Sequence, residues 1–277
     1  MSKTLILPDV HTRYELAETI IDKVKPDLTI FLGDFFDDFN DSPMVAENVA
    51  LWFVKSINKT DRIHLCGNHD VMYWFKDNMN TRCSGYHHSK SFVINNIVKR
   101  TDWEKLKFFH VLDNKWLLSH AGVHPVWINS DEFKSSTISE AKLSDIVEKL
   151  EYDSTQAIKN LQSNNDHWFT YAGFSRSMRS RSYGGLLWCD WNQEFIPMRG
   201  IHQIVGHTPQ RSLQKVVVHE DSDKYVVLPV EDSTSTDSSV MTDKNSYNIC
   251  LDSHPGSQYY AIYENNALTV HKVSDLK

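Results

Sequence analysis

The sequence has little of what several classes of protein require. Its 277 residues include four cysteines, none of them paired as Cys-x-x-Cys; they are Cys66, Cys83, Cys189 and Cys250. Cys66 and Cys250 belong to apolar runs and are expected to be buried like small hydrophobic residues. The cysteine pattern therefore predicts a reduced, cytoplasmic protein.

Long apolar runs are missing as well. The N-terminal run is only about five residues long and leads directly into a polar motif, so we expect a strand rather than a signal peptide or a membrane span. The formal net charge of −7 argues against extended nucleic-acid binding, because phosphate backbones select an excess of Lys and Arg. A polynucleotide end could still be bound locally. No internal repeat or domain linker is evident, so residues 1–277 are expected to form a single domain.

Five short polar motifs are the main positive signal. They are Asp9-Val10-His11, Gly33-Asp34-Phe35-Phe36-Asp37, Gly67-Asn68-His69-Asp70, Ser119-His120-Ala121-Gly122 and Gly206-His207-Thr208. Each follows an apolar run typical of a β-strand, at residues 4–7, 28–32, 63–66, 116–118 and 201–205. Strand ends hold side chains rigidly, and the oxygen and nitrogen ligands in these motifs suit a pair of divalent metals. The combination predicts a two-metal hydrolase.

Each motif alone has a simpler explanation. The chain contains 14 histidines, and a given histidine is more often packed or solvated than a metal ligand. Asp or Asn beside Gly most often marks a turn. Five independent turns are not expected to follow five strands with the ligand set of one site, so the binuclear interpretation is favoured.

In order and spacing, the motifs resemble those of the calcineurin-like metallophosphoesterase superfamily. Many members end the last motif with Gly-His-x-His, whereas Pro209 stands in place of the second histidine here. The chain is thus more similar to the branch that contains phosphoprotein phosphatases, bacteriophage phosphatases and symmetrical dinucleoside-tetraphosphate hydrolases. The resemblance covers residues 9 to 208. It implies an α/β fold, a four-layer αββα sandwich with two mixed β-sheets.

The resemblance also implies a role for each motif residue. The expected metal ligands are Asp9 and His11 for the first ion, Asp34 as the bridge, and Asn68, His120 and His207 for the second ion. A hydroxide held between the ions would attack phosphorus in line with the leaving group. His69 would protonate the leaving oxygen, oriented and kept cationic by Asp37. Manganese is the expected ion, and zinc, iron or nickel would fit the same ligands.

The sequence departs from the family pattern beside these motifs. Phosphoprotein phosphatases usually continue the second motif with Arg-Gly, where this chain has Asp38-Phe39, and they usually have Glu where it has Asp70. These departures argue against a dedicated Ser/Thr protein phosphatase. Another cation is then expected to bind the substrate phosphate, since an arginine does this as a bidentate fork. The candidates are Arg176, Arg179, Arg181 and Arg199, and the alternative for each is a solvated loop.

The remaining patterns predict the scaffold. Apolar residues at helical spacing predict helices at residues 14–25 and 44–57, and the alternation of strands and helices there favours a largely parallel sheet. One or two helices are expected in an insertion at about 131–165, as a lid or as plain scaffold. The C-terminal runs, at 216–218, 225–228, 247–251, 259–263 and 268–273, are expected to form the second sheet. Residues 231–243 are expected to be a mobile surface loop.

Three functions stay open. The favoured one is a phosphomonoesterase acting on phosphoproteins or small phosphorylated molecules. The second is a nucleotide hydrolase acting on dinucleoside polyphosphates or on cyclic or oligonucleotide diesters. The third, a non-catalytic scaffold, is disfavoured because no motif position has lost its functional residue type. An aromatic set would stack a base or a phosphotyrosine ring, or else belong to the core; it comprises Trp168, Phe169, Tyr171, Trp188 and Trp191.

Overall fold

The computed structural model describes residues 2–128, 138–177, 182–222, 224–230, 245–253 and 258–276. The strands are β1 (Thr4–Leu7), β2 (Leu28–Phe31), β3 (Arg62–His64), β4 (Phe109–Leu112), β5 (Trp116–Ser119), β6 (His202–Val205), β7 (Gln214–Val218), β8 (Tyr225–Pro229), β9 (Ser246–Cys250), β10 (Tyr259–Glu264) and β11 (Ala267–Lys272). The α-helices are α1 (Tyr14–Val24), α2 (Pro43–Ile57), α3 (Asn68–Trp74), α4 (His88–Ile97), α5 (Arg100–Trp103), α6 (Leu143–Gln162) and α7 (Gly173–Arg176). Short 3-10 helices are η1 (Met79–Thr81), η2 (Pro125–Trp127), η3 (Trp168–Thr170) and η5 (Val273–Asp275). Within these residues, no helix has both the length and the apolar character needed to cross a membrane.

The strands form two mixed sheets. The first has the order β11-β10-β1-β2-β3, with β1, β2 and β3 parallel and with β10 antiparallel to β1. The second has the order β4-β5-β6-β9-β7-β8, with β5, β6 and β9 parallel. Because the three N-terminal strands are connected by helices, they run in the same direction, as the alternation of elements predicts.

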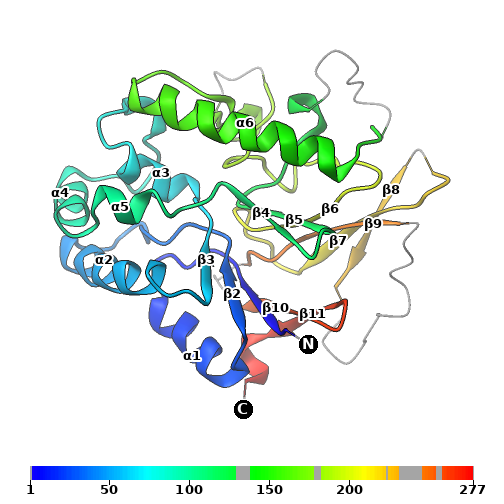
Figure 1. The fold of residues 1–277 in the computed structure, drawn as a ribbon, viewed down its shortest axis with the longest axis horizontal. Helices are drawn as coiled ribbons and strands as arrows, with labels where there is room; N and C mark the ends of the chain where they lie inside the picture. The colour runs from blue at the N-terminus through cyan, green and yellow to red at the C-terminus, as the bar shows by residue number, and fades with distance from the viewer. Residues whose placement is uncertain are drawn as a thin grey trace.

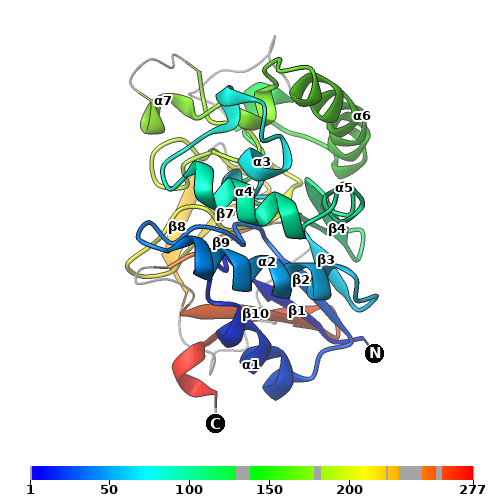
Figure 2. The same ribbon diagram turned by 90° about the vertical axis from the view of Figure 1, so that its left-hand side faces the viewer.

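The sheets pack face to face between helices. Alternate residues of a strand point to opposite faces, so Ile6 and Leu118 join the core between the sheets, whereas Leu5 and Leu117 join the clusters that face the helices. Figure 1 and Figure 2 show α6 on the side of the second sheet and α1 on the far side of the first. The predicted four-layer αββα sandwich is therefore confirmed.

The helices predicted in the first part of the chain are also confirmed. The first ends at Val24, because Lys25 takes a left-handed conformation with φ of 50° and Pro26 cannot continue the helix. The second begins at Pro43, after Ser42 caps the backbone N–H of Val45. Helices α3, α4 and α5 go beyond the prediction.

The expectation that all C-terminal strands join the second sheet is wrong. Strands β7, β8 and β9 do so, but β10 pairs with β1 and continues the first sheet, followed by β11. Alternation identifies the buried residues of a strand, here Ala261 and Tyr263, but not the sheet edge that receives it. In the predicted insertion, the described residues hold a single helix, α6. Residues 131–137 and the predicted loop at 231–243 lie outside the described residues.

His64 shows how the first sheet is tied to its helical cover. Its side chain is 2% exposed, its ring stacks on Phe31 with centroids 4.7 Å apart, and its Nε2 lies 2.8 Å from Ser56 Oγ in α2. Burial, reinforced by the charge of Arg62, lowers the pKa of His64 to about 3. The folded protein therefore holds this imidazole neutral.

This burial predicts acid sensitivity of the fold. Between pH 6.5 and pH 3 the unfolded chain binds a proton at His64 that the folded chain refuses, so stability falls as the pH drops. Between pH 7.5 and pH 5 the expected loss from this residue is about 2 kcal/mol. Urea unfolding of chelator-treated wild-type protein and His64→Phe at both pH values tests it. The variant should lose less stability than the wild type; equal losses would contradict the assignment.

Candidate active site

The five motifs lie at the carboxyl ends of five strands. Asp9 follows β1, Asp34 follows β2 and Asn68 follows β3 in the first sheet, while His120 follows β5 and His207 follows β6 in the second sheet. Parallel strands end at the same edge of a sheet, which is where binding sites of α/β proteins form. The two edges therefore bring these residues together.

Asp9, His11 and Asp34 form the first cluster of possible metal ligands. His11 Nε2 lies 3.9 Å from Asp9 Oδ2 and 3.6 Å from Asp34 Oδ2. His11 Nδ1 lies 2.6 Å from the backbone oxygen of Asp37, which only accepts hydrogen bonds. Nδ1 therefore carries the ring proton, and the lone pair of Nε2 is directed at the two carboxylates.

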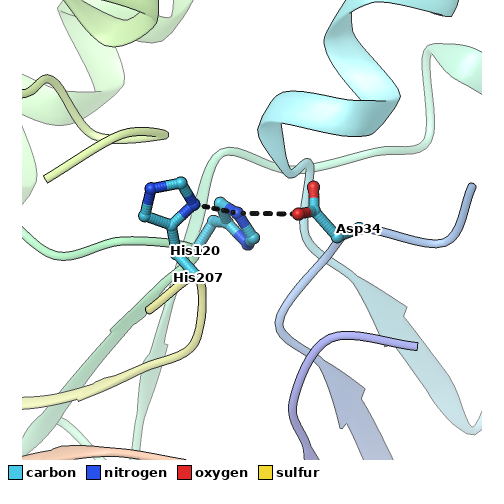
Figure 3. A group of neighbouring side chains, drawn as sticks. All are labelled: Asp34, His120 and His207. Atoms are coloured by element: carbon cyan, nitrogen blue, oxygen red, sulfur yellow. Dashed lines mark hydrogen bonds and ion pairs between the residues drawn. The ribbon is translucent and has the colours of Figure 1, made fainter. Parts of the chain in front are cut away.

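Asp34, His120 and His207 form the second cluster, which Figure 3 shows. His120 donates from Nδ1 to the backbone oxygen of Leu32 at 2.9 Å, and its Nε2 lies 3.4 Å from Asp34 Oδ2. His207 Nδ1 lies 3.2 Å from that Nε2. The side-chain oxygen of Asn68 is 3.0 Å from His120 Nε2 and 2.9 Å from His207 Nδ1. Four donor atoms thus converge, and Asp34 belongs to both clusters.

The electrostatics of the clusters call for a cation. Burial raises the pKa of Asp9, an effect opposed by His120 and reinforced by the nearby charge of Asp34. Burial also opposes ionisation of Asp34, but His120, His69 and His11 outweigh it and lower the pKa of that carboxyl. For His120, Asp34 and Asp9 outweigh burial and raise the pKa to about 9. A proton on His120 thus balances part of the carboxylate charge in the metal-free protein, whereas burial and the charge of His120 lower the pKa of His207.

The donor set and its surroundings fit two divalent ions. Two carboxylates, one amide oxygen and three imidazoles are ligands for manganese, zinc, iron or nickel. Two glycines make room for the carboxylates. A Cβ on Gly67 would overlap Asp34 Oδ1, and a Cβ on Gly206 would overlap Asp9 Oδ1. The identity of the metal does not follow from these contacts.

Several site residues have unusual backbone conformations. Positive φ values occur at His11 (37°), Asp34 (50°), Asp37 (64°) and His207 (69°). Such values are uncommon for residues other than glycine, and they tend to gather at functional sites, where the surrounding structure enforces them. Here they aim the side chains into the space between the sheet edges.

Asp70 holds the loops that carry the ligands, and the motif analysis did not predict this role. Its carboxylate accepts hydrogen bonds from the backbone N–H groups of Asp34, Phe35 and Gly67, each at 2.8 Å. These bonds tie the loop after β2 to the loop after β3. The sequence offered one signal, the position of Asp70 at the end of the third motif.

His69 and Asp37 form a pair beside the clusters. His69 Nδ1 lies 3.4 Å from Asp37 Oδ2. Burial opposes protonation of His69, but the charges of Asp34 and Asp37 outweigh it and raise the pKa of His69 well above its ordinary value. Asp37 also accepts hydrogen bonds from Tyr73 Oη at 2.8 Å and from Lys90 Nζ at 2.5 Å. No motif marks Tyr73 or Lys90 in the sequence.

Members of both clusters line a cleft of about 370 Å³, namely His11, Asp34, Asn68 and His207, and His69 lines it too. Arg176 lines it as well, and donates from Nε to Asp190 Oδ2 at 2.9 Å. Arg13, which sequence reasoning missed, also lines the cleft, and no described residue accepts a hydrogen bond from its buried Nε. Arg199 donates instead to the backbone oxygen of Ser222 at 2.7 Å and is not among the described residues that line the cleft. Arg179 and Arg181 lie outside the described residues.

The aromatic set divides between core and cleft. Trp188 lines the cleft, with its ring 5.6 Å from that of His207. Phe169 and Trp191 are buried, Trp168 stacks on Trp127, and Tyr171 is 39% exposed. Phe39, which is outside the predicted set, also lines the cleft.

Comparison with known proteins identifies a family. A family model described as calcineurin-like phosphoesterase matches residues 2–211. No curated protein matches the sequence significantly.

Solved structures show more distant similarity. A protein provisionally described as a diadenosine tetraphosphatase is 12% identical with a TM-score of 0.43, covering 98% of this chain and 93% of its own. A serine/threonine phosphatase from Saccharomyces cerevisiae, described as similar to human phosphatase PP5, is 15% identical with a TM-score of 0.47. The match covers 98% of this chain and 79% of the phosphatase chain. The phosphoesterase Yfce from E. coli is 10% identical with a TM-score of 0.37. The match covers 99% of this chain and 95% of the Yfce chain.

The shared position of Asp34 predicts the effect of replacing it. Asp34→Asn removes the charge that both clusters share, so we expect clearly less manganese per chain after dialysis than in the wild type. Asp38→Asn is the matched control, because Asp38 is an exposed acid of the same loop that lies outside both clusters. Elemental analysis of the folded proteins makes the comparison. Equal metal contents of all three proteins would contradict the bridging position.

Proposed function

We propose that this chain, which belongs to the calcineurin-like phosphoesterase family, is a metal-dependent phosphomonoesterase with His69 as its general acid. The observation that carries the proposal is the position of the His69 and Asp37 pair, in one cleft with members of two clusters of possible metal ligands. Metal-dependent phosphoester hydrolysis is the chemistry of the family. The proposal adds the reaction type and the roles of individual residues.

Each expected metal ligand belongs to one of the two clusters or lies beside it. Asp9 and His11 would hold the first ion, Asn68, His120 and His207 the second, and Asp34 both. Manganese is the ion that we expect in the working enzyme. When bound, a pair of divalent ions lowers the pKa of water and neutralises charge on the transferred phosphoryl group.

The chain's own residues supply the proton. His69 has Nδ1 beside Asp37 and lines the cleft, so in the proposed mechanism its other ring nitrogen, Nε2, donates a proton to the leaving oxygen. The charge of Asp34 and the hydrogen bond to Asp37 raise the pKa of His69, which favours the protonated form that a general acid needs. Tyr73 and Lys90 hold the Asp37 carboxylate in place, and Asp37 in turn orients His69.

Arg13 and Arg176 are the proposed partners of the substrate phosphate. Both line the cleft. They are needed because Asp38-Phe39 provides no cation at the position where the family pattern would have Arg-Gly. Among the described residues, none accepts a hydrogen bond from Arg13 Nε. Arg176 is held by Asp190 through Nε, so its two terminal nitrogens stay available for a phosphate fork.

A second candidate function is hydrolysis of nucleotides, including dinucleoside polyphosphates and phosphodiesters. The exposure of Trp188 to the cleft favours it, since an indole stacks a base. Turnover of a nitrophenyl monoester, its bis-diester, a phosphopeptide and diadenosine tetraphosphate by the manganese-loaded enzyme separates the candidates. The proposal requires the monoesters to be preferred.

We place the enzyme in the cytoplasm because all four cysteines are free.

The general-acid role predicts a dependence on the leaving group. His69→Asn should retain both metals but lose most turnover, roughly 100-fold or more, on alkyl phosphates. It should lose much less on nitrophenyl phosphate, because nitrophenolate leaves with little protonation. Steady-state kinetics on both substrates, with metal content measured in parallel, provide the test. Similar losses on the two substrates would show that His69 acts in some other way.

The proposed phosphate contact of Arg13 predicts a binding defect. Loss of a charge-assisted hydrogen bond in Arg13→Ala should weaken inhibition by inorganic phosphate by about tenfold or more. Arg100→Ala is the control, because Arg100 pairs with Glu104 on the exposed side of α5. The measurement is the inhibition constant of phosphate against nitrophenyl phosphate. An Arg13 variant that behaves like the Arg100 variant would remove Arg13 from the site.

A further inference from the structure

Phe39 occupies an unusual position for a large apolar side chain. It is 68% exposed, yet it lines the cleft together with His69. The two rings lie edge to face, with centroids 6.2 Å apart and planes at 84°. Single exposed apolar residues are common on protein surfaces. This one stands directly beside the proposed proton donor.

Phe39 lies on the side of the cleft where the leaving group of the substrate is expected. The transferred phosphorus belongs at the metal ligands, and the leaving oxygen must lie within hydrogen-bond reach of His69. The group attached to that oxygen then extends from His69 away from the ligand clusters. Phe39 borders this leaving-group side, whereas Arg13 and Arg176 are the proposed partners of the phosphate.

We propose that Phe39 forms a subsite for a planar aromatic leaving group, so that the preferred substrates are aryl phosphomonoesters of the phosphotyrosine kind. This inference rests on the proposed function, because His69 defines the leaving-group side. Aromatic rings prefer offset or edge-to-face contact at centroid separations of about 4.5–7 Å. A ring bonded directly to the leaving oxygen reaches such a contact with Phe39 while that oxygen bonds to His69.

Neighbouring charges distinguish this substrate from a nucleotide with further phosphates. Asp38 is the exposed residue before Phe39, and both line the cleft. Asp38 thus adds an anionic carboxylate to the part of the cleft that Phe39 lines. A leaving group with its own phosphates would meet like charge, which is unfavourable, whereas a neutral ring would not. In a nucleoside monophosphate, the ribose also places the base several bonds beyond the leaving oxygen.

The test compares binding of phenylphosphonate with binding of methylphosphonate to the manganese-loaded protein. Both carry the same anionic group and neither is hydrolysed, so calorimetry reports the subsite without turnover. We expect the wild type to prefer the phenyl compound, and Phe39→Ala to bind it about tenfold more weakly with less than a twofold change for the methyl compound. Phe39→Leu, which keeps apolar bulk without a ring, should lie between.

Phe92→Ala is the matched control, because Phe92 is 71% exposed on α4 and is not among the described residues that line the cleft. It should bind both phosphonates like the wild type. Equal effects of the Phe39 and Phe92 substitutions, or no phenyl preference in the wild type, would overturn the subsite. So would a Phe39→Ala protein that loses affinity for adenosine monophosphate but keeps it for phenylphosphonate.

The two levels of the account fail separately. Phenyl preference that depends on Phe39, in a protein that hydrolyses no monoester, would support the subsite and overturn the proposed function. Hydrolysis of alkyl and aryl monoesters with equal efficiency, unchanged by Phe39→Ala, would leave the proposed function intact and overturn the aromatic preference.

Discussion

The closeness of two buried carboxylates, Asp9 and Asp34, is the constraint on which the site depends. Each is at most 2% exposed, and buried like charges are costly unless cations or hydrogen bonds compensate them. The fold meets this demand by ending parallel strands of two sheets at one edge, which places histidines of the second sheet against carboxylates of the first. In the metal-free protein a proton on His120 compensates part of the carboxylate charge, and two divalent ions would take over this role.

The chain around the carboxylates is arranged to keep them fixed. Asp70 ties the loop that carries Asp34 to the loop that carries Asn68, and glycines at 67 and 206 give the carboxylate oxygens room. A second layer fixes Asp37 through Tyr73 and Lys90. The result is a cleft with two chemically different sides, one of metal ligands and arginines and one of His69 and Phe39. Under the proposed function, phosphate would bind on the first side and the alcohol or phenol would leave on the second.

Much of this arrangement could be predicted from the sequence, because the ligands follow strands in short motifs and strand ends are rigid. The strands before Asp9, Asp34 and His207 and the helices at 14–25 and 44–57 have clear local patterns. Arg13, Phe39, Tyr73 and Lys90 have none, since their proximity to the site depends on how loops and helices pack in three dimensions. The pairing of β10 with β1 escaped prediction for a related reason: alternation marks buried residues, not the partner strand.

The most direct test of the binuclear site is anomalous diffraction from crystals grown with manganese. The account predicts two manganese peaks about 3.5–4 Å apart, with the Asp34 carboxylate between them. One peak should lie by Asp9 and His11, and the other by Asn68, His120 and His207. A single peak, or peaks remote from Asp34 in a fully manganese-loaded crystal, would contradict the account.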